Sequence, residues 1–146
     1  MTSRDHAFDL AWDAVGRSEK SADELRRWLG ARGVEPADID AVLGRLVELG
    51  YVSDARVAEE AVQAAQGEKP VGKERVRAKL LRRGLDESLV ESAVGEMEHA
   101  SEVEKALTVA ARLGSGTGMA KTARYLAARG FDEETVRDTL ERLFPD

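Results

Sequence analysis

The chain of 146 residues has no cysteine and only two histidines, His6 and His99. Without cysteine there are no disulfides, no thiolate nucleophiles and no cysteine-based zinc sites. Two histidines so far apart in sequence favour neither a histidine-rich metal site nor a Ser-His-Asp triad. We therefore expect no enzyme activity, no metal and no cofactor.

Long apolar runs are also missing. No segment approaches the roughly 20 apolar residues that cross a bilayer, and no apolar core of a secretory signal follows residues 1–6. Proline is rare, with three residues, and aromatic residues make up only 5 %. With 34 % charged residues, this composition excludes collagen-like and membrane proteins. We expect a cytoplasmic protein with no membrane partner and no small-molecule substrate.

A pattern anchored on glycine occurs three times, with intervals of 51 and 46 residues between the glycines. Leucine lies four residues before each glycine, arginine lies one before, and an apolar residue follows directly. Further apolar residues lie six, ten and thirteen residues after each glycine. The first copy has Leu29, Arg32, Gly33, Val34, Ile39, Leu43 and Leu46; the second has Leu80, Arg83, Gly84, Leu85, Val90, Val94 and Met97; the third has Leu126, Arg129, Gly130, Phe131, Val136, Leu140 and Leu143. Such a repetition indicates tandem structural units.

The repeated pattern predicts a helix that ends at the glycine and a second helix that follows it. Glycine adopts the positive φ of a helix C-terminal closure at little cost, and the next apolar residue folds back onto the helix. Arginine before the glycine suits the negative end of the helix dipole. We expect the three leucines to occupy equivalent core positions, and the residues at +6, +10 and +13 to form buried stripes.

Each pair of helices is preceded by another helix with small apolar residues on one face. The sequence thus predicts nine helices and no strand, over residues 4–16, 21–31, 36–49, 53–66, 72–83, 86–99, 101–113, 118–129 and 132–143. Capping boxes, Ser21 with Glu24 and Ser101 with Glu104, mark two of the helix starts.

These elements predict an all-α fold of three tandem three-helix repeats that form an elongated, curved helical body. The repeats would span residues 1–50, 51–99 and 100–146. A single ordinary helical bundle is the alternative.

The net charge of −6 is distributed unevenly along the chain. Residues 69–83 carry seven basic residues and one acidic residue, whereas residues 84–104 carry seven acidic residues and no basic one. Residues 105–130 carry five basic residues and no acidic one, and residues 131–146 carry six acidic and two basic residues. The middle helix of each repeat is therefore basic and the third helix is acidic.

Three cations of the middle repeat, Arg75, Lys79 and Arg82, share one helical face at positions i, i+4 and i+7. Two interpretations are open. Neighbouring acidic helices neutralise the basic ones within the molecule, or the cations bind an acidic partner surface or a phosphate backbone.

The segment Gly114-Ser115-Gly116-Thr117-Gly118, followed by Lys121-Thr122, looks like a phosphate-binding loop. A P-loop has glycine directly before Lys-Ser/Thr and follows a strand, whereas here Ala120 precedes the lysine and a helix precedes the loop. We interpret the segment as a flexible connection between two helices.

Two stretches resemble the RecX family. The first comprises Ser21–Leu29, Gly33, Val42-Leu43, Leu46 and Gly50-Tyr51-Val52-Ser53-Asp54 with Arg56. The second is Gly72-Lys73, Arg75-Val76-Arg77, Lys79-Leu80 and Arg83-Gly84-Leu85. The resemblance extends over about residues 7–144.

What the resemblance implies is a non-enzymatic regulator of the RecA recombinase, built of three-helix repeats. Such a protein inhibits strand exchange and ATP hydrolysis from the groove of the RecA–DNA filament. The chain departs from the family pattern at Val57 and Ala61-Val62, where aromatic residues are usual, and in its acidic balance. We therefore expect direct DNA binding to be weak. Other functions left open are a helical DNA-binding protein and a protein-interaction scaffold.

We expect the partner-binding surface to follow the basic middle helices. Its candidate residues are Lys73, Arg75, Arg77, Lys79, Arg82 and Arg83, extended by Arg26, Arg27, Lys121 and Arg124.

Overall fold

The computed structural model describes residues 1–146 and contains nine α-helices and no strand. They are α1 (Ser3–Arg17), α2 (Ala22–Ala31), α3 (Pro36–Glu48), α4 (Asp54–Ala64), α5 (Lys73–Arg82), α6 (Glu87–Gly95), α7 (His99–Ala111), α8 (Met119–Ala128) and α9 (Glu133–Leu143). The predicted all-α fold is therefore confirmed. None of the helices combines the length and the apolar character needed to cross a membrane.

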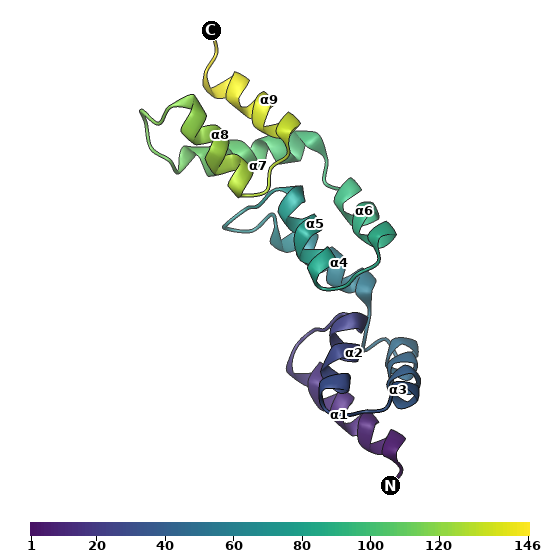
Figure 1. Ribbon diagram of the computed structural model, residues 1–146. Helices are drawn as coiled ribbons and strands as arrows, with labels where there is room; N and C mark the ends of the chain where they lie inside the picture. Colours follow the sequence, from purple (N-terminus) through teal and green to yellow (C-terminus); the bar gives the residue numbers. More distant parts are fainter.

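The helices form three units that follow one another along an elongated body, with the chain ends at opposite tips (Figure 1). Unit 1 contains α1–α3, unit 2 contains α4–α6, and unit 3 contains α7–α9. Helices pack mainly against helices of their own unit, and each unit has its own cluster of buried apolar side chains. The molecule is thus a row of small cores rather than a single bundle.

The three glycine closures have the same hydrogen-bond pattern. In unit 1 the amide of Val34 donates to the carbonyl oxygen of Leu29 at 3.2 Å, and that of Gly33 donates to Gly30 at 3.1 Å. The corresponding bonds close α5 and α8, which is the Schellman geometry. Gly33, Gly84 and Gly130 have φ of 79°, 82° and 92°, and Leu29, Leu80 and Leu126 are fully buried. Both predictions are confirmed.

Local signals place some helix starts correctly and one wrongly. The capping box of Ser21 and Glu24 is present, and Thr2 and Asp5 form another at the start of α1. The capping box predicted at Ser101 is wrong, because α6 ends at Gly95 and α7 already begins at His99. The chain bends between these helices so that Met97 is buried in the core of unit 2.

The predicted apolar stripe is buried in units 1 and 2 but not in unit 3. Val136 and Leu140 are only partly buried, and Leu143 is 39 % exposed. Thr135 and Thr139 instead occupy the buried face of α9. Helix α9 packs on α7 and α8 of its own unit, and the two threonines lie on its buried face.

Replacing Leu80 with alanine removes a fully buried side chain from the core of unit 2. We expect this change to lower the free energy of unfolding by about 2–5 kcal/mol, measured by urea denaturation. The neighbouring Leu81 is 44 % exposed, so Leu81→Ala is the matched control and should cost much less.

Gly33 and Gly130 share a positive φ but differ in their surroundings. A Cβ at Gly33 meets nothing within 4 Å, whereas a Cβ at Gly130 lies 2.4 Å from the Cβ of Arg75. We expect Gly33→Ala to cost about 1–2 kcal/mol from backbone strain alone, and Gly130→Ala to cost clearly more. Equal losses in denaturation experiments would contradict the close packing between units 2 and 3.

Candidate functional site

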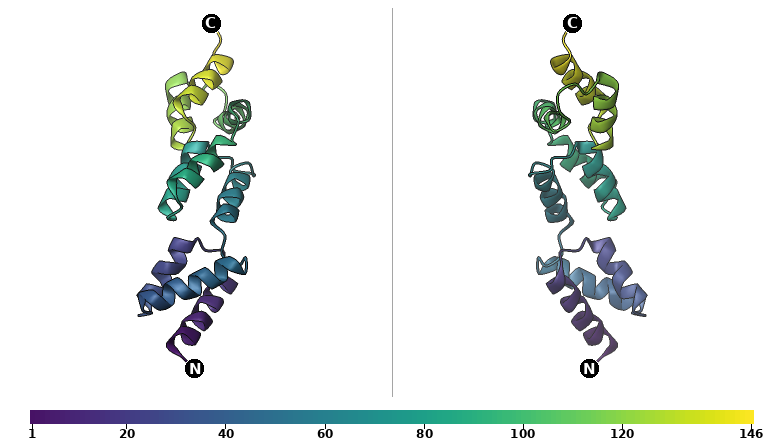
Figure 2. Two further views of the ribbon diagram at one scale, coloured as in Figure 1. Left: turned by 90° about the vertical axis from the view of Figure 1, so that its right-hand side faces the viewer. Right: turned by 90° about the vertical axis from the view of Figure 1, so that its left-hand side faces the viewer.

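The middle helices of the three units, α2, α5 and α8, follow one another end to end along one side of the body (Figure 2). Where α5 ends, the hydroxyl of Ser21, which caps α2, donates to the carbonyl oxygen of Arg83 at 2.6 Å. The negative end of one helix dipole therefore lies at the positive end of the next. We call the three helices the basic row.

The junction between α8 and α5 uses the same kind of contact. The amides of Gly72 and Glu74, at the start of α5, donate to the carbonyl oxygens of Arg129 and Gly130 at 2.9 Å each. This bonding brings the closure of α8 so near that a Cβ at Gly72 would lie 2.3 Å from the Gly130 oxygen. Glycine at both positions is what permits the approach.

Acidic residues from the following unit complete both helix starts. A carboxylate oxygen of Asp54, at the start of α4, accepts a hydrogen bond from the Ala22 amide at 2.8 Å. Glu102 of α7 accepts from the Lys73 amide at 2.7 Å. Glu102 is 1 % exposed and also pairs with Lys105. Carboxylates at helix N-termini satisfy free amides and oppose the positive dipole end.

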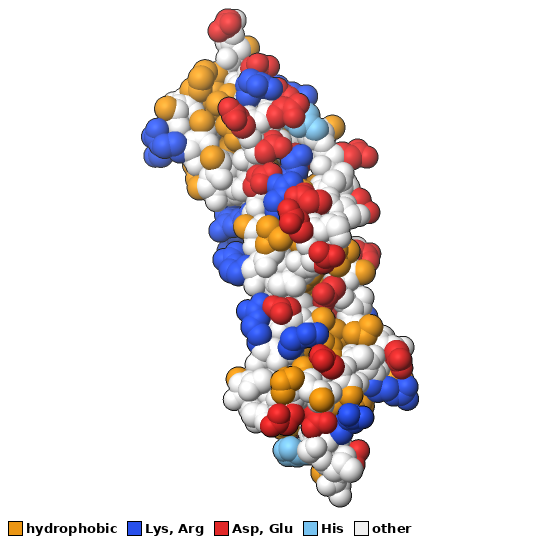
Figure 3. Space-filling view, turned by 45° about the vertical axis from the view of Figure 1, so that its right-hand side comes forward, with side chains coloured by type: hydrophobic (Ala, Val, Ile, Leu, Met, Phe, Trp, Pro, Cys, Tyr) orange, Lys and Arg blue, Asp and Glu red, His pale blue; other side chains and the backbone are white.

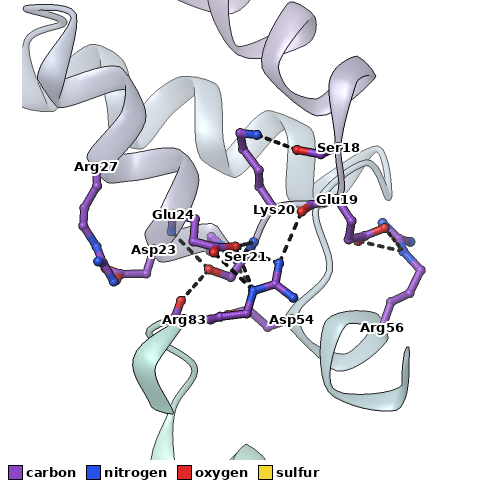
Figure 4. Close-up of polar contacts among 11 residues, drawn as sticks. Ser18, Glu19, Lys20, Ser21, Asp23, Glu24, Arg27, Asp54, Arg56 and Arg83 are labelled. Carbon is purple, nitrogen blue, oxygen red and sulfur yellow. Dashed lines mark hydrogen bonds and ion pairs between the residues drawn. The ribbon is translucent and has the colours of Figure 1, made fainter. Parts of the chain in front are cut away.

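Figure 4 shows the junction of units 1 and 2, where Arg83 extends from unit 2 toward unit 1. Its guanidinium pairs with Glu24 at 2.8 Å and donates to the carbonyl oxygen of Glu19 at 3.2 Å. Burial of Glu24 disfavours its charged form, but hydrogen bonds from Arg83 and the Ser21 amide outweigh that effect and lower the pKa of the carboxyl. The hydrogen bond to Glu24 in turn raises the pKa of Arg83.

Several of the predicted cations have partners inside the molecule. Lys73 pairs with Asp132 of unit 3 at 3.2 Å, and Arg77 pairs with Glu91 at 2.8 Å and with Glu74. In unit 1, Arg27 pairs with Asp23, and Arg26 lies 4.0 Å from Asp40. Lys73 and Arg83 thus join neighbouring units and Arg77 joins α5 to α6, whereas the pairs of Arg26 and Arg27 are exposed and lie within unit 1.

The other predicted cations have no ion pair and no side-chain hydrogen bond, and all are exposed. They are Arg75, Lys79 and Arg82 of α5, and Lys121 and Arg124 of α8. We call these five residues the free cations. In Figure 3 lysine and arginine side chains lie along the left edge of the middle part of the molecule, and acidic side chains are frequent toward its right. The charges are mixed in the lower part of the view.

The one cluster with metal-ligand residue types joins His99 to Glu134 and Asp138 of α9. His99 Nε2 lies 2.7 Å from Asp138, and Nδ1 is enclosed without a partner. A metal ion at Nε2 would leave the ring proton on Nδ1, where no acceptor is available. The geometry therefore favours an ordinary hydrogen bond between α7 and α9.

Comparisons with known proteins agree with the fold. Residues 7–46 match the family model described as RecX, first three-helix domain. The Regulatory protein RecX of Chlorobium phaeobacteroides is 31 % identical over 94 % of this chain and 93 % of its own length. The chain belongs to the RecX family.

Further RecX proteins extend this relationship. The Regulatory protein RecX of Chromohalobacter salexigens is 35 % identical over 95 % of this chain and 91 % of its own. The crystal structure of RecX from Lactobacillus salivarius has a TM-score of 0.89 and covers 97 % of this chain and 96 % of that one, at 19 % identity. Its likeness shows that the same fold persists at low identity.

Sequence reasoning did not find the residues that join the units in this RecX chain. Asp54 and Glu102 act on helices of a different unit, and Ser21 combines its own capping box with a bond to Arg83. The only local signal was the glycine start of α5, since Gly72 has no side chain with which to cap the helix itself.

The lowered pKa of Glu24 gives the junction of units 1 and 2 a pH dependence. A carboxyl whose pKa is lower in the folded state contributes stability above its unfolded pKa and loses it as pH falls through the folded value. We expect stability to fall below about pH 4.5, and Glu24→Gln to reduce this acid slope in urea denaturation at stepped pH. Glu59→Gln, at an exposed and unpaired glutamate, should leave the slope unchanged.

Proposed function

We propose that this chain regulates a RecA recombinase by binding its DNA filament and inhibiting ATP hydrolysis and strand exchange. The free cations form the surface that contacts the filament. The other cations of the basic row serve the structure of the regulator itself. RecX proteins are named as regulatory proteins, and the RecA partner follows from the family resemblance.

The observation that carries the proposal is the row of cations without partners. Like charges gathered on one side of a protein repel one another, and neighbouring carboxylates neutralise only the other cations of the row. An acidic partner surface would remove this repulsion and desolvate the guanidinium and ammonium groups in favourable contacts.

The length of the row suits a filament rather than a single small site. Each middle helix has ten residues, so the three helices together extend over roughly 45 Å. Free cations lie on two of the three helices. Such a surface can contact neighbouring subunits of a helical assembly at the same time.

The experiment replaces the three free cations of α5 together. Arg75→Ala, Lys79→Ala and Arg82→Ala remove no internal ion pair, so we expect the variant to keep its helicity and to melt within a few degrees of the wild type. It should lose most of its inhibition of RecA ATP hydrolysis, because a truncated charged interface contact costs about 2–5 kcal/mol.

The matched control changes three exposed arginines outside the row, Arg17, Arg45 and Arg142. It removes the same total charge, so it should inhibit RecA nearly as well as the wild type. Full inhibition by a folded α5 variant, or equal losses in both variants, would show that the free cations are not the contact surface.

Direct DNA binding is a separate outcome of the same variants. If the row binds the phosphate backbone, affinity for bare DNA should fall steeply with salt, and the α5 variant should have a shallower slope. Inhibition lost without a change in DNA affinity would assign the contact to the recombinase protein.

A further inference from the structure

The junction between units has two halves, and it occurs twice in the molecule. One half is the closure of a middle helix, with its arginine, glycine and apolar residue. The other is the start of the preceding middle helix. In each junction, carbonyl oxygens of the closure accept hydrogen bonds at the helix start.

Residues of both halves are buried at the two junctions. The residues that begin α2 and α5, Ser21 and Gly72, are buried. The apolar residues of the docked closures, Leu85 and Phe131, are 5 % and 3 % exposed. Leu85 and Phe131 also belong to the apolar clusters of their own units, so the burial of Ser21 and Gly72 is the clearer mark of an occupied junction.

Each end of the molecule carries one half without its counterpart. The closure of α2 is open, since Arg32 and Gly33 are exposed, Val34 is only half-buried, and neither the Arg32 nor the Gly33 carbonyl oxygen accepts a hydrogen bond. At the far end, Gly118 is exposed where it begins α8. Helix α8 has no side-chain cap, whereas Glu102 supplies one to α5 across the junction.

A groove with both apolar and charged walls lies beside the open start of α8. Its apolar residues are Met119, which is 50 % exposed, with Val136, Leu140, Phe144 and Pro145, and its charged residues are Glu133, Arg137, Glu141 and Asp146. A terminal repeat normally presents a polar outer face to water. Val136 and Leu140, whose counterparts in units 1 and 2 are buried, are only partly buried here.

We infer that copies of this chain associate head to tail, with the Arg32–Gly33–Val34 closure of one copy docked on the start of α8 and the groove of the next. The contact would continue the basic row from one molecule to the next in the geometry used twice inside each molecule. The negative end of α2 would then lie at the positive end of α8. This inference does not depend on the proposed function.

A second copy is the occupant favoured by the structure because it carries the same docking motif in an unused form. Of the three closures, those of α5 and α8 are already docked. A head-to-tail contact of this kind does not close on itself and so forms open chains. The small area of a single closure makes the association weak.

The test measures average mass by sedimentation from micromolar to near-millimolar concentration. Wild-type protein should rise in mass beyond two copies. Gly33→Asn keeps the closure, because asparagine tolerates positive φ, but its side chain obstructs docking. Met119→Glu places a carboxylate in the groove, where it also faces the carbonyl oxygens of the docking closure. The dissociation constant of each variant should be at least about tenfold higher than that of the wild type.

The decisive measurement mixes the two variants. Each retains one intact end, so the mixture should form pairs and nothing larger, while neither variant alone does so. Gly50→Asn is the control for the first variant, since Gly50 closes α3 with φ of 82° and open space around it. Val47→Glu is the control for the second, with the same 50 % exposure.

Three results would overturn the inference. One is a wild-type protein that remains monomeric over the whole range. Another is an assembly that stops at two copies, which is a symmetric dimer. The last is association that persists in both variants, since the contact would then lie elsewhere on the surface.

Discussion

The docking of a glycine closure on the start of the preceding middle helix determines the rest of this structure. Because Gly84 and Gly130 have no side chain, carbonyl oxygens at the end of one middle helix come within hydrogen-bond distance of the start of the preceding one. That contact aligns α2, α5 and α8 in a row. The row in turn brings cations from separate parts of the sequence to one side of the molecule, where the free cations lie exposed on α5 and α8.

Hydrogen bonds and ion pairs, rather than a shared apolar core, join the units. The three apolar clusters remain separate, and the junctions contain Arg83 with Glu24, Lys73 with Asp132 and the buried Glu102. Such polar contacts are directional, so they fix the orientation of one unit on the next. Ion pairs that are withdrawn from water contribute little net stability, because desolvation offsets much of the attraction between the charges. Their main effect here is to fix how one unit is oriented on the next.

The elements that follow from local sequence were predictable. Periodic apolar residues, the Arg-Gly closures and the Ser21 capping box act within a single helix or turn. All the residues that form each of these signals therefore lie close together in the sequence, where they can be recognised without the structure. Which cations remain free was not predictable, because Arg83 and Glu24 are 59 residues apart in sequence, as are Lys73 and Asp132. The burial of Thr135 and Thr139 was missed because it depends on which side of α9 packs on α7 and α8.

Three cations of unit 3 reach one loop of unit 2, and this makes the third unit sensitive to ionic strength. Lys105, Arg112 and Arg129 donate to the carbonyl oxygens of Val71, Glu68 and Pro70, just beyond the end of α4. The apolar cluster of unit 3 has four buried members, against ten in unit 1 and eleven in unit 2, so its contacts with unit 2 matter more to it than such contacts matter to the other units. In a row of repeats, the stability of each unit depends in part on its interface with the neighbouring unit. Salt weakens charged contacts more than apolar ones, so we expect ionic strength to affect unit 3 more than units 1 and 2.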